Sequence, residues 1–184
     1  MKIILATAMI LVATSMVAAS ELPDGWYRVG DSGDGGYTVT VGDDIGYEGA
    51  GLEISGPENT NRQFGGVGQS ISASDYAGKT VRITAFIRTE SVDNGYAGLW
   101  FRVDKGEDML VLDNMNDRGV TGTTDWHPYT SVLRVDAEAT SMLFGAILTG
   151  SGRMFVDEFA IDIVPDDTPT TAGYGPNEPK NLSF

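Results

Sequence analysis

The sequence contains no cysteine and only one histidine, His127. It can therefore form no disulfide framework, thiolate metal site or cysteine nucleophile, and a multi-histidine metal centre is excluded as well. Basic residues are also scarce: 12 lysines and arginines stand against 26 acidic residues, which gives a net charge of −14. Because such a charge repels a phosphate backbone, we expect no nucleic-acid partner.

Apolar runs long enough to cross a membrane are missing after the N-terminus. At the N-terminus itself, Lys2 precedes an apolar run over residues 3–17, and the small residues Ala18, Ala19 and Ser20 follow. This order is typical of a secretory signal peptide, here residues 1–20, although a run of this length could also be an uncleaved membrane anchor. We expect an extracytoplasmic mature protein, periplasmic or secreted, with no membrane span.

Glycine is abundant, with 24 residues in 184, and the sequence between the glycine-rich turns alternates in polarity. Two segments, 79–88 and 96–104, place apolar side chains at every second position, the pattern of strands with one face in a core. Their predicted core positions are Val81, Ile83, Ala85 and Ile87, and Ala97, Leu99, Phe101 and Val103. Further strands are predicted at 26–29, 37–41, 51–55, 65–71, 109–112, 129–135, 142–149 and 153–164.

Turn signals separate these predicted strands. Asp93-Asn94-Gly95 predicts a turn, and the segment 149–152, Thr-Gly-Ser-Gly, predicts a tight hairpin. About ten short strands with regular turns indicate an all-β protein, a jelly-roll β-sandwich of two antiparallel sheets, over residues 21–164. Residues 165–184 form a C-terminal tail rich in proline and threonine, which is linker composition.

Few residues suggest catalysis. Ser151 lies between two glycines, but a turn explains this setting better than a nucleophile does. Asp125 and His127 are two apart beside Trp126, and spacing alone does not make them a dyad. We therefore predict that the protein is not an enzyme.

The face opposite the predicted core carries an unusual mixture of rings and charges. Phe86 and Arg88 share one side of the first alternating segment, and Trp100, Arg102 and Asp104 share one side of the second. If the two segments are neighbours, these side chains form one patch, in which rings stack on sugar C–H faces and polar groups bind hydroxyls. Asp113, Asn114 and Trp126 are predicted to add contacts at its edge. Alternatively, another sheet or the tail covers this face, and the protein is a structural or protein-interaction domain without a small ligand.

Asp157 is the one carboxylate in an otherwise apolar register that contains Phe155, Phe159, Ile161 and Ile163. A carboxylate placed among apolar side chains must be paired or bound to a cation. Calcium prefers oxygen ligands, so Asp157 is predicted to hold a structural calcium ion. The predicted co-ligands are Asp43, Asp44 and Glu48. A β-bulge that turns Asp157 toward solvent is the alternative.

Several motifs resemble those of a bacterial jelly-roll family. They are Gly98-Leu99-Trp100-Phe101-Arg102-Val103-Asp104, Leu112-Asp113-Asn114-Met115, Gly122-Thr123-Thr124-Asp125-Trp126, Phe144-Gly145-Ala146-Ile147-Leu148-Thr149-Gly150 and Met154-Phe155-Val156-Asp157-Glu158. The family is galactose-binding-like and similar to carbohydrate-binding modules. Its members also resemble ancillary modules found beside processing peptidases and in proteins described as transcriptional regulators.

The resemblance implies a role for the whole domain and for one residue. It implies a non-catalytic module that binds a saccharide or a cell-envelope glycan. Where such a module is ancillary, the resemblance also implies a partner protein. In similar carbohydrate-binding jelly rolls, an aspartate of the final strand helps to hold a structural calcium ion, and Asp157 occupies that place.

The first testable prediction concerns export. Because the apolar run ends in Ala18-Ala19-Ser20, signal peptidase should cut after Ala19 or Ser20. The intact mass of protein recovered from the medium or periplasm should match a chain that begins at Ser20 or Glu21. Recovery of exported protein that still carries Met1 would contradict this prediction.

Overall fold

A computed structural model describes residues 21–32, 36–58 and 63–171 of the chain. The predicted signal peptide, residues 1–20, lies outside the described residues, as does the part of the predicted tail from 172 to 184. Within the described ranges, no helix is long and apolar enough to cross a membrane.

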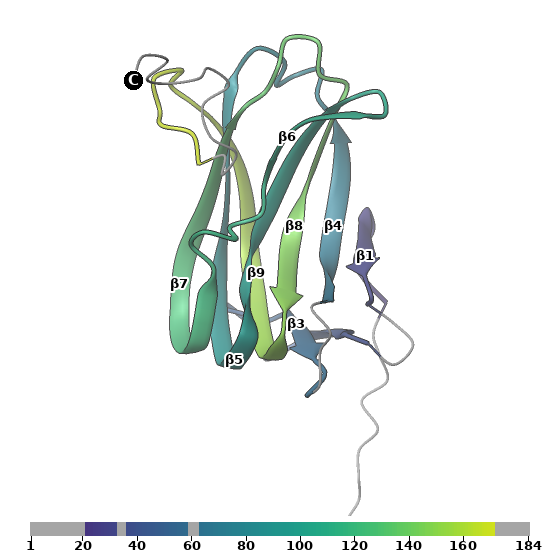
Figure 1. Ribbon diagram of the computed structural model, residues 1–184, viewed down its shortest axis with the longest axis vertical. Coiled ribbons are helices and arrows are strands. Elements are labelled where there is room, and N and C mark those ends of the chain that lie inside the picture. Colours follow the sequence, from purple (N-terminus) through teal and green to yellow (C-terminus); the bar gives the residue numbers. More distant parts are fainter. Residues whose placement is uncertain (1–20, 33–35, 59–62, 172–184) are drawn as a thin grey trace, which may run out of the picture.

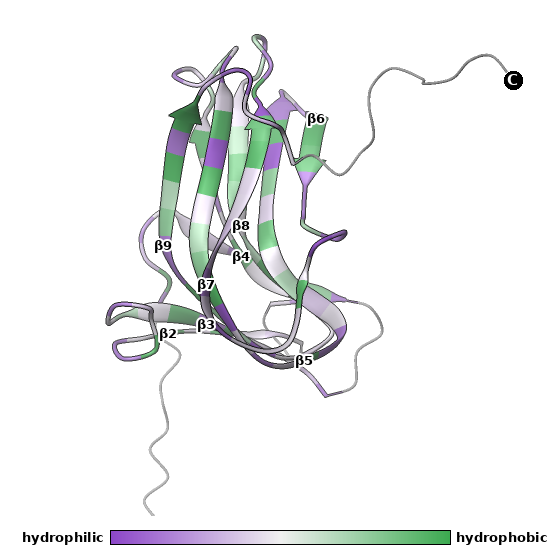
Figure 2. Cartoon of the chain, turned by 90° about the vertical axis from the view of Figure 1, so that its left-hand side faces the viewer, coloured by the Kyte–Doolittle hydropathy of each residue, from purple (hydrophilic) through white to green (hydrophobic). Residues whose placement is uncertain are grey.

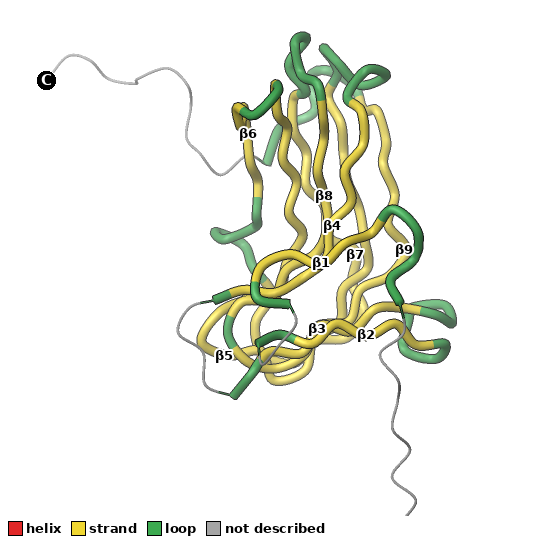
Figure 3. The backbone as a smooth tube through the Cα atoms, turned by 90° about the vertical axis from the view of Figure 1, so that its right-hand side faces the viewer, coloured by secondary structure: helices red, strands yellow, loops and turns green. Residues whose placement is uncertain are grey.

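Nine strands make up the described fold, and the tube in Figure 3 shows strands and loops with no helix among the described residues. Most of the predicted strands agree with the structure within two residues. The segment 120–128 was missed, because Gly122 and Pro128 interrupt the alternation there; pairing with a neighbouring strand nevertheless makes it β. The strands are β1 (Trp26–Gly30), β2 (Thr38–Gly42), β3 (Gly51–Gly56), β4 (Phe64–Ser72), β5 (Thr80–Lys105), β6 (Asp108–Asp113), β7 (Val120–Arg134), β8 (Ser141–Thr149) and β9 (Ser151–Val164).

The strands form two layers that share β5. The first half of β5 pairs with β7 and β9, and β9 continues through β3 to β2. The second half pairs with β6 and β8, and β8 continues through β4 to β1. We call β7-β5-β9-β3-β2 the first sheet and β6-β5-β8-β4-β1 the second sheet; every pairing is antiparallel. The predicted jelly-roll β-sandwich is confirmed, and Figure 1 shows the long strands side by side.

β5 passes from one sheet to the other as one continuously paired strand, with shifts of register at the crossing. The turn predicted at Asp93-Asn94-Gly95 is therefore wrong. The sequence there does indicate unusual backbone angles, since Ser91 and Asn94 have positive φ angles of 53° and 56°. However, Val92 pairs with Gly122 and Asp93 with Ser151. Pairing on both sides of the crossing overrides the local turn preference.

The hairpin predicted at residues 149–152 is also wrong. β8 and β9 follow one another with only Gly150 between them, yet they pair with different strands in different sheets. Gly150 has a φ of +79°, and a Cβ atom there would lie 2.2 Å from the carbonyl oxygen of Asp93. The backbone N–H of Tyr96 also donates to Oγ1 of Thr149 at 2.8 Å. The two places where the chain changes sheets thus pack against each other at one end of the sandwich.

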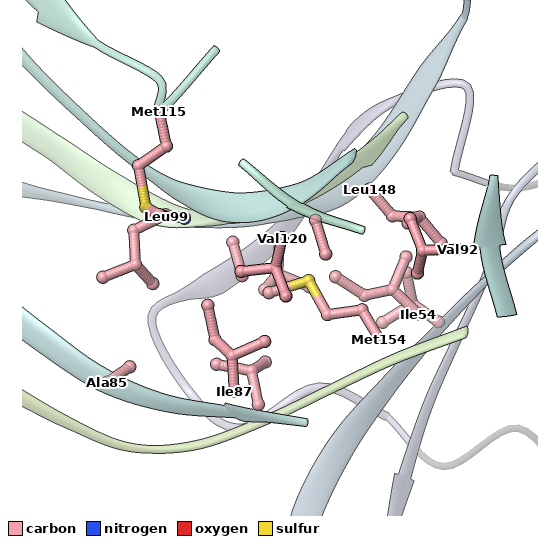
Figure 4. Close-up of a cluster of buried hydrophobic side chains, with 14 of the residues drawn as sticks. Ile54, Ala85, Ile87, Val92, Leu99, Met115, Val120, Leu148 and Met154 are labelled. Carbon is pink, nitrogen blue, oxygen red and sulfur yellow. Dashed lines mark hydrogen bonds between the residues drawn. The ribbon is translucent and has the colours of Figure 1, made fainter. Parts of the chain in front are cut away.

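The core lies between the two sheets, and the predicted inward positions of β5 are confirmed. Ile83 and Ile87 from the first half and Leu99 and Phe101 from the second half are all fully buried. The stripes of alternating hydropathy along the strands in Figure 2 follow this pattern. Figure 4 shows Ile87, Leu99, Val120 and Met154 meeting in the space between the sheets.

One buried carboxylate fastens the two sheets together at the edge where β6 faces β7. Asp113, at the end of β6, is 2% exposed. Its carboxylate accepts hydrogen bonds from Ser131 of β7 at 2.6 Å and from Thr171 of the tail at 2.6 Å. It also accepts two from Arg118 at 2.5 and 2.9 Å, and one from the backbone N–H of Met115 at 3.1 Å.

These donors make folding sensitive to acid. Burial alone would raise the pKa of Asp113, but the bonds from Arg118, Ser131, Thr171 and the backbone of Met115 outweigh it and lower the pKa below its ordinary value. A carboxylate with a depressed folded-state pKa stabilises the fold above the pKa of the unfolded chain. That stabilisation is lost as the pH falls through the folded-state pKa.

Replacing Asp113 should therefore have two measurable effects. Asp113→Asn should lower the free energy of unfolding at neutral pH by about 2–3 kcal/mol, because Arg118 loses its buried anionic partner and keeps only the exposed Asp117. It should also weaken the dependence of stability on pH in the acid range. Urea unfolding of both proteins at several pH values checks this, and equal stability at neutral pH would contradict it.

Candidate functional site

The predicted ligand residues divide between the two outer faces of the sandwich. Phe86 and Arg88 lie in the first sheet, where Phe86 stands opposite Pro128 and Asp157. Trp100 and Arg102 lie in the second sheet, opposite Gly145 and Leu143. Since β5 changes sheets between these pairs, the single patch predicted from the sequence is wrong. The two outer surfaces face away from each other and must be judged separately.

On the second sheet, Trp100 lies over a floor made of glycine. A Cβ atom on Gly68 of β4 would come within 2.5 Å of Cζ2 of Trp100, and one on Gly145 of β8 within 2.9 Å of its Nε1. The indole N–H donates to the carbonyl oxygen of Val67 at 3.1 Å. Glycine at these two outward positions therefore makes room for the ring to rest on the backbone, and the indole is half-buried.

Around this ring the second sheet forms a groove of about 450 Å³. Side chains from all five strands of the sheet line it, together with Asn114 after β6, so it crosses the sheet over roughly 19 Å at the usual strand spacing. We call it the Trp100 groove. Its lining is Tyr27, Val29, Phe64, Tyr96, Trp100, Arg102, Leu112, Asn114, Leu143, Ile147 and Thr149.

Rings and aliphatic side chains dominate the Trp100 groove. Tyr27 and Phe64 are exposed to 38% and 44%, and the Tyr27 ring lies beside Gly68, next to Trp100. Sequence reasoning found Trp100, Arg102 and Asn114 but missed Tyr27 and Phe64. The alternation of β1 and β4 would have placed them outward, but nothing in the sequence tells which strands adjoin β5.

Among the described residues, Arg102 is the only charged side chain that lines the groove, and it is already paired. Its Nε–H donates to Oδ1 of Asp104 at 2.6 Å. The side chain of Asp104 is 7% exposed and that of Arg102 is 35% exposed. Burial raises the pKa of Tyr27, with a lowering contribution from Arg102 and a raising one from Asp104, which places the pair close to the tyrosine.

Asp113, predicted to contact a ligand at the edge of the patch, is not available for that role. Its carboxylate is buried and already accepts five hydrogen bonds within the fold. Asp113 instead links β6 to β7 through these hydrogen bonds. Its neighbour Asn114 does reach the Trp100 groove.

The outer face of the first sheet carries a separate aromatic cluster. Tyr47, from the loop after β2, stacks on Phe86 with ring centroids 4.1 Å apart and packs edge-on against Trp126. The guanidinium of Arg88 lies 3.8 Å from the ring centre of Phe155 and bonds to Glu90 at 2.5 Å. Phe86 is thus covered by Tyr47, and binding of a ligand by Phe86, Arg88 and Trp126 stays a prediction.

Asp157 adjoins this cluster at a β-bulge. Glu158 has a positive φ of 55°, and the register of β9 against β5 shifts there. Phe155 and Asp157 therefore face outward, whereas Phe159 and Ile161 pack on the core. The β-bulge that the sequence left open as an alternative is therefore present in β9.

The carboxylate of Asp157 holds the loop after β2. Its Oδ2 accepts the backbone N–H groups of Tyr47 at 3.0 Å and Glu48 at 3.4 Å, and its Oδ1 accepts that of Glu158 at 2.8 Å. Although Asp43, Asp44 and Glu48 belong to this loop, no group of three or more acidic or histidine side chains among the described residues could hold a metal ion. N–H donors aimed at the carboxylate satisfy it without a cation, so this donor set does not fit calcium.

The comparisons with known proteins come from sequence and from structure. No family model matches the chain. The chain is 38% identical over 127 residues to the uncharacterized HTH-type transcriptional regulator YbfP of Bacillus subtilis, a match that covers 66% of this chain. It spans only 43% of the length of that curated relative.

Solved structures share the architecture at low identity. The chain is similar to the xylan-binding CBM22-1 domain of Paenibacillus barcinonensis Xyn10C, with 21% identity, a TM-score of 0.50, and coverage of 79% of this chain and 89% of that one. It is similar to the CBM22-1–GH10 modules of Clostridium thermocellum xylanase 10B at 15% identity and TM-score 0.53, over 76% of this chain and 26% of that one. It is also similar to tailspike protein 4 of bacteriophage CBA120 at 15% identity and TM-score 0.58, over 77% of this chain and 20% of that one.

The described fold is therefore the galactose-binding-like jelly roll of carbohydrate-binding modules. The resemblance inferred from the sequence motifs is confirmed at the level of the fold. Identities of this size define the architecture and leave the ligand to be argued from the surface itself.

The contacts of Asp157 generate a prediction about metal removal. EGTA should leave the melting temperature unchanged, because three backbone N–H groups already satisfy the carboxylate. Asp157→Ala should lower stability by about 1–2 kcal/mol whether or not calcium is present, since the Tyr47 loop loses its anchor. Thermal unfolding with EGTA and with added calcium tests both. A melting temperature that falls with EGTA and recovers with calcium would restore the metal site.

Proposed function

We propose that the protein is a non-catalytic binding module whose Trp100 groove takes up a saccharide chain, such as a cell-envelope glycan. The observation that carries the proposal is the position of Trp100, whose indole rests against Gly68 and Gly145 in an open groove. A ring that rests on the backbone cannot turn away, so the face that it presents is fixed before a ligand arrives. Such preorganisation reduces the ordering cost of binding.

The lining of the groove suits a sugar. Pyranose rings have apolar C–H faces that stack on aromatic rings, and Trp100, Tyr27 and Phe64 provide such rings. Sugar hydroxyls need hydrogen-bond partners at defined positions, and Arg102, Asn114 and Thr149 provide them along the same surface. Two solved structures with this fold are named for xylan or were solved with xylohexaose, which supports the proposal.

The relation to the regulator fits a binding module as well. No helix is described in residues 21–32, 36–58 and 63–171, so this part of the chain cannot supply a helix-turn-helix. We propose that the segment shared with YbfP binds a ligand and that its use depends on the protein to which it belongs. We further propose export to an extracytoplasmic location, on the strength of the sequence of residues 1–20.

The Trp100 groove should lose ligand binding when its central ring is removed. Trp100→Ala should weaken binding to a responsive glycan more than tenfold, because a stacked aromatic anchor contributes a large share of a small interface. The melting temperature should fall only a few degrees, since the ring lies outside the core and forms one hydrogen bond. A glycan array followed by calorimetry on the mature protein measures the effect.

Trp126→Ala provides the matched control, because Trp126 lies on the outer face of the other sheet. It should leave glycan binding unchanged. If Trp100→Ala unfolds the domain while Trp126→Ala abolishes binding, the groove is not the site. If the intact protein binds no glycan on the array, the protein-interaction alternative becomes the better account.

A further inference from the structure

We propose that the Trp100 groove selects uncharged saccharide chains and rejects chains that carry carboxylate groups. This inference rests on the proposed function and adds the class of ligand. Its basis is the ion pair between Arg102 and Asp104, which neutralises the only charged side chain among the described residues that line the groove.

The two partners of this pair differ in their access to solvent. Asp104 is nearly buried, at 7% side-chain exposure, so its charge depends on Arg102 for compensation. Within the described ranges, Asp104 forms the only ion pair of Arg102. Arg102 is 35% exposed and lines the groove, and among the described residues its guanidinium donates only to Asp104, through Nε.

This arrangement treats neutral and anionic ligands differently. A sugar hydroxyl can accept a hydrogen bond from an Nη group of Arg102 while the bond to Asp104 stays intact. A carboxylate brought to the same place also approaches the carboxylate of Asp104, whose Oδ1 lies 2.6 Å from Nε of Arg102, and like charges placed together oppose binding. The net charge of −14 adds a weaker repulsion over longer distances.

The test compares pairs of oligosaccharides that differ only in charge. The probes are xylohexaose that carries one glucuronic acid branch against its uncharged methyl ester, and cellohexaose and a β-1,4-galactan hexamer, each with and without oxidation of its C6 positions. The intact protein should prefer the neutral member of whichever pair it binds by about tenfold or more. Its affinity for that neutral member should not change with salt, because no net charge is exchanged.

Three variants make the comparison specific to the ion pair. Asp104→Asn keeps the shape and still accepts the Nε–H of Arg102, but it frees the positive charge. It should reduce or reverse the preference for the neutral probe, and its affinity for the anionic probe should fall with salt. Arg102→Gln should strengthen the rejection of the anionic probe. Arg102→Gln combined with Asp104→Asn removes both charges and should show a preference between those of the two single variants, and thermal unfolding checks that each variant is folded.

The outcomes separate this inference from the proposed function. If the intact protein binds a neutral probe and its anionic counterpart equally well, or if Asp104→Asn leaves the ratio unchanged, the selectivity is overturned while saccharide binding stands. If the intact protein binds none of the six probes and no glycan on the array, both the selectivity and the saccharide-binding function are overturned.

Discussion

One strand belongs to both sheets, and the rest of the structure depends on this constraint. β5 contributes buried side chains to the core from both halves, so the two layers cannot separate without breaking its pairing with β7, β9, β8 or β6. The connection between β8 and β9 crosses beside it, through Gly150. Asp113 links β6 to β7 at one edge. The two sheets are thus joined by the continuous chain of β5, by the β8–β9 connection and by a buried carboxylate, without any disulfide.

The same strand provides both outer surfaces, and they differ in character. On the first sheet, Tyr47 covers Phe86, and Asp157 holds the loop that carries Tyr47. On the second sheet, small outward residues leave the face open, and Trp100 rests in the space that they provide. An open face with a fixed ring offers a site for a ligand, whereas rings that cover one another stabilise the fold. For this reason the groove of the second sheet is the better candidate site.

Much of the fold could be predicted from alternation alone. Val81 to Ile87 and Ala97 to Val103 are buried as the pattern indicates, because period-two burial is a local property of each strand. The crossing at Asp93–Gly95 and the connection at Gly150 could not be predicted in this way. Turn-forming residues indicate where the backbone adopts unusual angles, and Ser91 and Asn94 do have positive φ angles. Turn-forming residues do not indicate which strands pair with the segments on either side of them.

The candidate site was only partly predictable for the same reason. Trp100 and Arg102 were identified as outward-facing groove residues, but their grouping with Phe86 and Arg88 assumed that the two halves of β5 were neighbours in one sheet. The role of Asp113 could not be predicted, since its partners Ser131 and Thr171 are distant in sequence. Asp157 in an apolar register did mark the bulge at Glu158 as an alternative, but the pattern could not decide between a bulge and a bound cation.

The three tryptophans occupy three different environments, and this allows a direct test of the central claim. Trp26 is partly buried and packs against the core through Phe144 and Phe159, Trp126 lies on the first sheet, and Trp100 lies in the groove of the second. The measurement is a titration of the ¹⁵N-labelled protein with xylohexaose or another neutral oligosaccharide that it binds, followed by the three indole N–H signals. We expect the Trp100 signal, assigned with Trp100→Phe, to shift while those of Trp26 and Trp126 stay in place. A shift of the Trp126 signal with that of Trp100 unmoved would contradict the assignment of the groove as the saccharide site.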